Sequence, residues 1–386
     1  MIIGIPKEIM PGEDRVAAAP DAVKQYREEG FEVLVQKGAG LGAYYLDEQY
    51  VDAGAKIVED PQSLFDQADL ILKVKEPQMN QSLGKHEADM MHEGQYLITF
   101  IHPAAPGNHE MTKKLAKNGV ISFTLDTIPR ISRAQAMDAL TSMSTCAGYK
   151  GILMAANLMT RFMPQVFTAV GQIKPAQALI IGTGVGGLQA IATAKRLGCV
   201  VQAADIRPDA AEQAGSLGAK VIDLGVPKEL AMGEGGYAKQ LPADVLEKER
   251  AILAPYVKEA DVIFCSALVP GEVAPIVITE EMVQSMKHGS VIVDISIDQG
   301  GNCAITPPGK IEEKYGVQLV GIKNIPGQIP TTSTWLFSKN VHALVNFLFK
   351  DGKPCYDPND EIVKGSLTTE KGEIKHHGAR VAMGLE

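Results

Sequence analysis

The run of glycines at residues 182–187 constrains the fold more than any other stretch of this sequence. It reads Gly-Thr-Gly-Val-Gly-Gly and directly follows residues 178–181, a short apolar run of the buried-strand type. Residues 188–197 come next, and their apolar positions recur at helical spacing. The glycines therefore fall on a turn that leads from a strand into a helix.

The positions of the individual glycines match the turn that binds a dinucleotide. In such a turn Gly182 permits the tight bend, Gly184 lets a pyrophosphate approach the backbone, and Gly187 lets the helix pack closely on the strand. Free N–H groups and the positive end of the helix dipole then face the phosphates. We include Val185, which lies inside the motif, among the predicted cofactor contacts.

An acidic residue after the next predicted strand indicates which dinucleotide binds. Residues 200–204 form this strand, and Asp205 follows it, about 20 residues beyond the glycines, where a carboxylate accepts the ribose hydroxyls of NAD. A 2′-phosphate would be repelled there, so we expect NAD(H) rather than NADP(H), although Arg207 nearby weakens that preference. The alternative is a purely structural glycine turn in an α/β domain, which the second strand and its acid disfavour.

Composition limits the class of protein. The chain has 386 residues, which predicts two domains, and its formal net charge of −9 argues against nucleic-acid or anionic-membrane binding. No apolar run approaches the 18 or more residues of a membrane span, and the N-terminus does not resemble a signal peptide. The five cysteines are scattered, with no metal-binding or disulfide spacing. We expect a cytoplasmic protein with reduced thiols and no metal site.

Strands and helices alternate before and after the glycine turn. This pattern predicts an α/β protein with two Rossmann-like domains, whose parallel sheets are separated by a cleft. The predicted boundaries are 1–138 plus 325–386 for a discontinuous substrate domain and 139–324 for the NAD(H)-binding domain. Residues 134–162 lack helix breakers and predict a long helix that links them. The glycine-rich insertion at 224–241 is either a mobile lid or a plain surface loop.

Four polar residues follow predicted strands at the edge where open α/β sheets bind ligands. They are Arg15, Lys75, His102 and Asp298. Arginine can grip a carboxylate, lysine can polarise a carbonyl, and histidine can move a proton near neutral pH, while the aspartate can orient that proton. Singly, each could be a surface charge or a structural histidine. Together they predict hydride transfer on a 2-oxo or amino acid.

The sequence resembles the alanine dehydrogenase / pyridine nucleotide transhydrogenase family along nearly its whole length. Besides the glycine turn, the resemblance rests on short motifs at residues 6–8, 13–17, 73–77, 268–271 and 289–294.

Some motifs resemble the soluble NAD(H)-binding component of the alpha subunit of a proton-translocating NAD(P) transhydrogenase. The match of residues 129–138 to this branch implies that Arg130, Gln135 and Asp138 contact the nicotinamide. The match of residues 235–239 implies a mobile loop carrying Tyr237. In this branch hydride passes to a nucleotide on another subunit, and the membrane and NADP-binding subunits are separate chains.

The four polar residues resemble the alanine dehydrogenase branch instead. The resemblance implies that Arg15 and Lys75 hold the substrate carboxylate and carbonyl, with His102 as acid/base and Asp298 assisting. Ser144 and Val269 would line the nicotinamide half of the cofactor site. Because function follows the site rather than the fold, the leading prediction is an NAD-dependent, alanine-type dehydrogenase. It would interconvert an L-amino acid with a 2-oxo acid and ammonia, as a homodimer or homohexamer. The transhydrogenase subunit is the alternative, and a non-enzymatic NAD sensor the remote one.

Overall fold

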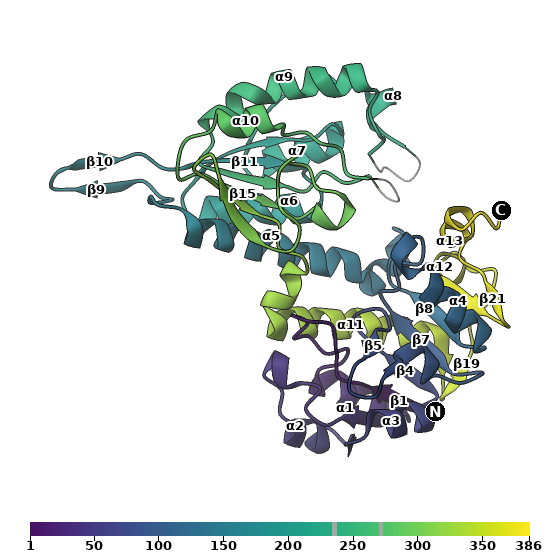
Figure 1. Ribbon diagram of the computed structural model, residues 1–386. Coiled ribbons are helices and arrows are strands. Elements are labelled where there is room, and N and C mark those ends of the chain that lie inside the picture. The colour runs from purple at the N-terminus through teal and green to yellow at the C-terminus, as the bar shows by residue number, and fades with distance from the viewer. Residues whose placement is uncertain (234–237, 270–272) are drawn as a thin grey trace. The chain divides into compact units, whose positions relative to one another are not determined.

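The computed structural model describes residues 1–233, 238–269 and 273–386 (Figure 1). The chain divides into two compact units, which we call unit 1 (Met1–Met143 and Pro326–Glu386) and unit 2 (Ser144–Ile325). Each unit is built on one large, mostly parallel sheet, which confirms the predicted α/β class. Tyr237 and the glycines beside it, on which the predicted mobile loop rests, lie outside the described residues.

Unit 1 contains an eight-stranded sheet within its described residues, in the order β21-β20-β8-β7-β4-β1-β2-β3. Its six parallel strands are β1 (Ile2–Ile5), β2 (Glu32–Gln36), β3 (Lys56–Val58), β4 (Leu70–Leu72), β7 (Tyr96–Thr99) and β8 (Ile121–Thr124). The C-terminal segment adds β20 (Leu367–Glu370), antiparallel to β8, and β21 (Glu373–Ile374), antiparallel to β20. The last segment of the chain is thereby built into the sheet of unit 1.

The helices of unit 1 cover this sheet and begin at residues suited to that task. Pro20 starts α1 at a position where its missing N–H costs nothing, and the Asp60 carboxylate caps α3 by accepting a hydrogen bond from Ser63 N. Leu64 on α3 and Leu115 on α4 share one buried cluster with strand residues. The α-helices are α1 (Pro20–Glu28), α2 (Asp47–Asp52), α3 (Pro61–Gln67), α4 (His109–Lys117), α11 (Pro330–Leu348), α12 (Glu361–Ser366) and α13 (His377–Ala382). Short 3-10 turns are η1 (Leu41–Ala43), η2 (Glu87–Asp89), η3 (Pro106–Asn108), η4 (Ser132–Met137) and η7 (Ile325–Gln328), and two small ribbons are β5 (Met79–Asn80) with β6 (Lys85–His86) and β18 (Phe349–Lys350) with β19 (Lys353–Pro354).

Unit 2 contains a seven-stranded sheet within its described residues, in the order β13-β12-β11-β14-β15-β17-β16. Its strands are β11 (Gln177–Ile181), β12 (Val200–Ala204), β13 (Lys220–Val221), β14 (Val262–Cys265), β15 (Val291–Asp294), β16 (Ile311–Lys314) and β17 (Val317–Val320). All pairs are parallel except β16 with β17. The expectation that the strand near residue 318 ends the sheet is wrong, because β16 pairs with β17 on its outer side.

Helices cover both faces of the unit 2 sheet, as a doubly wound fold requires (Figure 1). Ile180 of β11 packs in one buried cluster with residues of α5 and α6, and its neighbour Ile181 packs in a second with residues of α9 and α10. The elements are α5 (Ala139–Leu158), α6 (Val185–Arg196), α7 (Pro208–Ser216), α8 (Lys228–Ala231), α9 (Ala243–Glu259), α10 (Glu280–Gln284), η6 (Ile297–Gln299), β9 (Val166–Thr168) and β10 (Gly171–Ile173). The β9–β10 hairpin projects from the body of unit 2.

The long helix predicted for residues 134–162 is broken near its start. The 3-10 turn η4 ends at Met137, and α5 begins only at Ala139. Asp138 between them leaves the helical conformation, and its carboxylate accepts hydrogen bonds from Thr141 N (2.9 Å) and Thr141 Oγ1 (2.7 Å). An aspartate that caps the first turn in this way starts a new helix. None of the helices formed by the described residues is both long and apolar enough for a bilayer-crossing segment.

Candidate active site

The glycine turn between β11 and α6 has a backbone that requires glycine at two positions. Gly182 has φ +84°, and a Cβ atom there would lie 2.6 Å from Ala267 N. A Cβ on Gly187 would lie 2.0 Å from the carbonyl oxygen of Gly182. Both distances are shorter than any real contact, so these two glycines hold the turn tightly against the sheet.

Gly184 differs, because the space beside it is open. The nearest atom to a Cβ built there is Arg207 Nη2, at 3.9 Å. The helix α6 starts at Val185, and no side chain caps it with a hydrogen bond at Gly184. Its first N–H groups therefore point into a space that an anionic group could enter, and a dinucleotide pyrophosphate fits both the opening and the dipole.

Asp205 lies where β12 ends, but its carboxylate is already engaged. Its side chain is only 4% exposed. Oδ2 accepts hydrogen bonds from Thr183 N (2.7 Å) and Arg207 Nη2 (2.8 Å), while Oδ1 accepts from Arg207 N (2.8 Å) and Nε (2.9 Å). Asp205 thus ties the glycine turn to β12, and a ribose hydroxyl could reach its oxygens only if Arg207 released them.

Glu249 on α9 is a second acid in this region that the sequence did not single out. It is buried, and burial raises the pKa of Glu249 to about 7, with the negative charge of Asp205 adding to the effect. Two carboxylates therefore share the surroundings of the ribose position.

The remaining predicted cofactor residues are spread over both units. In unit 2 the carbonyl of Ser144 lies beside Gly186, since a Cβ built on that glycine would be 3.3 Å from it, and Val269 is buried. In unit 1 the side chains of Arg130 and Gln135 are exposed. Asp138 caps α5, as described above.

Arg15 in unit 1 is a buried, paired cation. Glu13 accepts hydrogen bonds from Arg15 Nε (2.7 Å) and Nη2 (2.6 Å), and Nη1 lies 2.9 Å from Met143 Sδ. The two carboxylate and guanidinium side chains are 0% and 2% exposed. Burial opposes ionisation of Glu13, but the Arg15 guanidinium outweighs it, and together with Lys75 it lowers the pKa of Glu13. The alternative that Arg15 is a solvated surface charge is therefore excluded.

His102 forms a dyad with Asp126. Its Nδ1 lies 2.6 Å from Asp126 Oδ1, and its backbone N–H donates to Asp126 Oδ2 at 2.7 Å. Burial opposes protonation of the ring, yet the Asp126 carboxylate outweighs this and raises the pKa of His102 above its usual value, helped by Glu76 and opposed by Lys75. His102, Lys75 and Glu76 therefore lie close enough to interact.

Lys75 follows a buried ion-pair triad in the chain. Two residues before it, Lys73 is fully buried, with its Nζ 3.1 Å from both Glu8 and Glu87. Thr99 Oγ1 donates to the Lys75 carbonyl at 2.8 Å, which holds the backbone of this segment after the end of β4. Unit 1 thus brings Lys75, His102 and the Glu13–Arg15 pair into one electrostatic cluster.

Asp298 belongs to unit 2 and is not a member of that cluster. It lies in η6, its side chain is 60% exposed, and Oδ1 pairs with Lys323 Nζ at 3.6 Å. An exposed pair of this length contributes little to stability, so nothing in the fold requires an aspartate here.

Asp126 is the residue of this cluster that the sequence interpretation missed. It comes two residues after β8, at the same edge as His102, and the strand-end rule that selected Lys75 and His102 applies to it equally.

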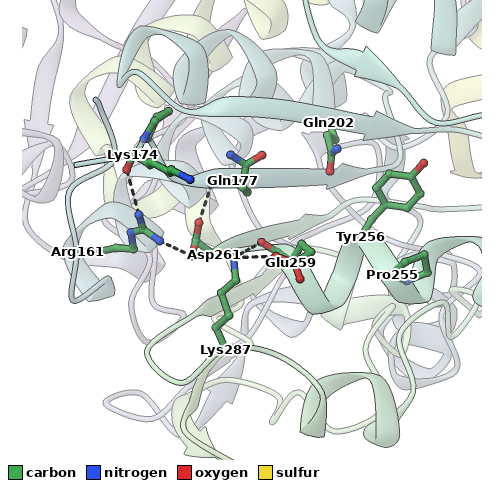
Figure 2. Close-up of a pocket in the computed structure, with 10 residues that line it drawn as sticks. Arg161, Lys174, Gln177, Gln202, Pro255, Tyr256, Glu259, Asp261 and Lys287 are labelled. Atoms are coloured by element: carbon green, nitrogen blue, oxygen red, sulfur yellow. Dashed lines mark hydrogen bonds and ion pairs between the residues drawn. The ribbon is translucent and has the colours of Figure 1, made fainter. Parts of the chain in front are cut away.

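A second hollow, of about 650 Å³, lies at the opposite edge of the unit 2 sheet, where β11 and β14 begin (Figure 2). Asp261 is its centre. The Asp261 carboxylate accepts from Arg161 Nη1 (2.9 Å) and from Gln177 N (2.8 Å), and lies 3.5 Å from Lys287 Nζ. This network joins the starts of neighbouring strands and acts as a structural clamp.

The fold and the glycine turn together define a nucleotide-dependent oxidoreductase of the Rossmann type. Comparison with known sequences agrees: residues 4–147 match "Alanine dehydrogenase/PNT, N-terminal domain", and residues 151–377 match "Alanine dehydrogenase/PNT, C-terminal domain". The chain belongs to the alanine dehydrogenase/PNT family, which confirms the resemblance found in its motifs. Members of this family are NAD-dependent oxidoreductases, and NAD(H) is their cofactor.

Relatives from both branches cover the whole chain. It is 42% identical to the first of the separate chains of the NAD(P) transhydrogenase alpha subunit of Rhodospirillum rubrum over 382 residues, or 97% of this chain and 98% of the relative. It is 33% identical to the "Alanine dehydrogenase" of Staphylococcus haemolyticus, covering 100% and 97%. The solved structure of the transhydrogenase from Sinorhizobium meliloti superposes with a TM-score of 0.83 at 35% identity, covering 98% and 99%. The comparisons support the transhydrogenase interpretation better than the leading dehydrogenase prediction.

Proposed function

We propose that this chain is the NAD(H)-binding component of the alpha subunit of an NAD(P) transhydrogenase, made as a separate chain. The observation that carries the proposal is the end-to-end match to a relative that is itself such a separate chain, at higher identity than to the alanine dehydrogenase. The open turn at Gly184 and the uncapped start of α6 support it, because they suit a dinucleotide.

The proposal gives each region of unit 2 a task. The N–H groups at the start of α6 would hold the pyrophosphate, and Asp205 would accept ribose hydroxyls once Arg207 had moved. Bound NAD(H) supplies or accepts the hydride. The resemblance assigns the nicotinamide half to residues from both units, namely Arg130, Gln135, Asp138, Ser144, Tyr237 and Val269.

Partners follow from the same proposal. The NAD(H)-binding component of a transhydrogenase needs an NADP-binding subunit to exchange hydride with and a membrane subunit on which the complex works, so this chain would be peripheral to the membrane. We also propose that it forms a homo-oligomer.

Reconstitution tests the proposal. The purified chain, mixed with an NADP(H)-binding transhydrogenase subunit, should transfer hydride from NADPH to an oxidised NAD analogue, and neither protein should do so alone. A chain that binds NADH but never supports this transfer with the partner present would contradict the proposal.

The dehydrogenase remains a second candidate because of one observation, the His102–Asp126 dyad beside Lys75. A transhydrogenase subunit needs no acid/base group for a substrate, whereas a 2-oxo acid needs a cation at its carbonyl and a proton donor. In this reading Lys75 polarises the carbonyl and His102 moves the proton.

A simple assay separates the two candidates. The isolated chain is incubated with NAD and a panel of L-amino acids, and NADH formation is followed by absorbance. NADH formation that is lost in His102→Ala, while NADH binding is retained, supports the dehydrogenase. An inactive wild-type chain that still binds NADH supports the transhydrogenase subunit.

A further inference from the structure

We propose that Asp126 is the positioning residue of His102: it holds the imidazole with Nδ1–H directed at its carboxylate, so that Nε2 is the atom left to exchange a proton with a ligand of unit 1. This goes beyond the transhydrogenase function. Its use in turnover rests on the dehydrogenase candidate, but the positioning itself does not.

The imidazole is held from three directions. The backbone of His102 has φ +49°, a left-handed conformation that few non-glycine residues adopt. The Phe100 ring stacks against it with centroids 5.8 Å apart and planes 2° apart. Asp126 holds both ends of the residue, with one oxygen at the ring Nδ1 and the other at the backbone N–H. Strain of this kind persists only where the surroundings enforce it, and it clusters at functional sites.

Asp126 is itself fixed and charged. Its Oδ2 accepts hydrogen bonds from Ile101 N (3.1 Å) and from the Thr124 hydroxyl, and its side chain is 13% exposed. Burial opposes its ionisation, but His102 and the other hydrogen-bond donors lower the pKa of Asp126. A carboxylate that is held in this way is an acceptor of fixed direction, which decides the tautomer of its histidine partner.

The rest of the ring faces a polar environment that a ligand could enter. The His102 side chain is 42% exposed although Nδ1 is engaged. Lys75 and Glu76 are the charged groups that act on it besides Asp126, and Asp126 also acts on His376. Glu76 Oε2 is buried and has no hydrogen-bond partner among the described residues. Such an orphaned acceptor near the ring is where a ligand N–H would be expected to bind.

A purely structural role is the competing explanation, since Asp126 also accepts two backbone N–H groups of the 101–102 segment. A structural role would leave the tautomer of the ring undetermined, so nitrogen chemical shifts decide between the two. The wild-type chain is labelled with ¹⁵N-histidine, and His102 is assigned by comparison with His102→Gln. Above the pKa of His102, the proposal expects Nδ1 to carry the proton and Nε2 to be bare.

The variant Asp126→Asn completes the test. We expect a lower pKa for His102 and a mixture of tautomers, whereas the control Thr124→Val, which removes only the hydroxyl contact to Asp126, should keep the wild-type tautomer. If the chain oxidises amino acids, Asp126→Asn should lower kcat at least about tenfold with an unchanged Kd for NADH, and the acidic limb of the pH profile should move down in pH. A proton on Nε2 in the wild type would overturn the proposal, and so would an Asp126→Asn spectrum like that of the wild type. An absence of dehydrogenase activity would instead count against the candidate function alone.

Discussion

Two glycines of the turn, Gly184 and Gly187, separate cofactor binding from folding at the level of single residues. Gly184 has φ −68° and open space beside it, so Gly184→Ala should change the free energy of unfolding by less than about 1 kcal/mol. The new methyl group would stand where a pyrophosphate approaches the backbone. We therefore expect the Kd for NADH to rise at least tenfold, which corresponds to about 1.4 kcal/mol, in a fluorescence titration.

The matched control is Gly187→Ala. Its Cβ would clash with the Gly182 carbonyl at 2.0 Å, so this variant should lose about 3 kcal/mol or more of stability, whether or not cofactor is present. If Gly184→Ala bound NADH as tightly as the wild type, the pyrophosphate would have to bind elsewhere.

Glu249 gives a pH-dependent prediction. Its pKa of about 7 in the folded chain lies above the value of 4.5 for an exposed glutamate, so folding favours the protonated form. Stability is therefore fully kept below about pH 4.5 and is lost as the pH rises through 7. Replacing the carboxyl by the neutral amide in Glu249→Gln should stabilise the chain at pH 8 by up to about 3 kcal/mol, and by less than about 1 kcal/mol at pH 5. Urea denaturation followed by circular dichroism at the two pH values measures this. An equal effect at both values would show that the Glu249 carboxyl is not protonated on folding.

At the residue scale, the sequence was informative where one residue type is almost compulsory. The need for glycine at 182 and 187 follows from backbone geometry, so the motif alone located the turn. It could not show that Arg207 covers Asp205 or that Asp126 orients His102, because both depend on side-chain rotamers set by the folded surroundings.

Among the elements, the strands of unit 2 share one anchoring side chain. Asp261 precedes β14, its carboxylate holds the first residue of β11, and its carbonyl accepts from Val291 N of β15 (Figure 2). In Asp261→Asn an NH₂ group would replace one of the two acceptor oxygens, so either Gln177 N or Arg161 would lose its partner. Hydrogen bonds to charged groups are worth about 1.5–3 kcal/mol, and we expect a loss of about 2 kcal/mol in the opening free energy of β11 and β14, measured by hydrogen exchange.

A neighbouring acid supplies the control for that prediction. Glu259 pairs with the same Lys287 at 3.6 Å, but its side chain is 70% exposed, so Glu259→Gln should change the opening free energy by less than about 0.5 kcal/mol. Similar losses in the two variants would mean that Asp261 acts only as a surface charge.

Element boundaries were predictable where local chemistry decides them. The strand beginning at Ile2 and the helix after the glycine turn follow from apolar spacing. The break at Asp138 did not, because helix formers lie on both sides of it and only the hydrogen bonds to Thr141 interrupt the helix. The antiparallel pairing of β16 was equally hidden, since an edge strand with alternating exposure carries a weak pattern.

For the whole molecule, alternation of strands and helices was enough to predict the α/β class, because each parallel pair requires a crossover. The return of the C-terminal segment into the unit 1 sheet as β20 and β21 depends on pairing with β8, more than 240 residues away, as the Ser122–Thr369 hydroxyl contact shows. Local patterns do not encode contacts of that sequence separation.

The division into two units leads to a prediction for the whole molecule. Every group expected to hold the adenosine and pyrophosphate half of the cofactor, including Gly184, the start of α6 and Asp205, lies in unit 2, which has its own sheet and buried clusters. A fragment of residues 139–325, which keeps α5 entire, should therefore fold alone. It should bind ADP-ribose within about threefold of the full chain's affinity, a difference under about 1 kcal/mol, as measured by calorimetry. NADH should lose more affinity than ADP-ribose, because the resemblance places Arg130, Gln135 and Asp138 at the nicotinamide. The same fragment carrying Gly184→Ala serves as the non-binding control. A folded fragment that bound ADP-ribose more than tenfold weaker than the full chain would show that unit 1 supplies some of the adenosine site, and the assignment of that half to unit 2 would have to be abandoned.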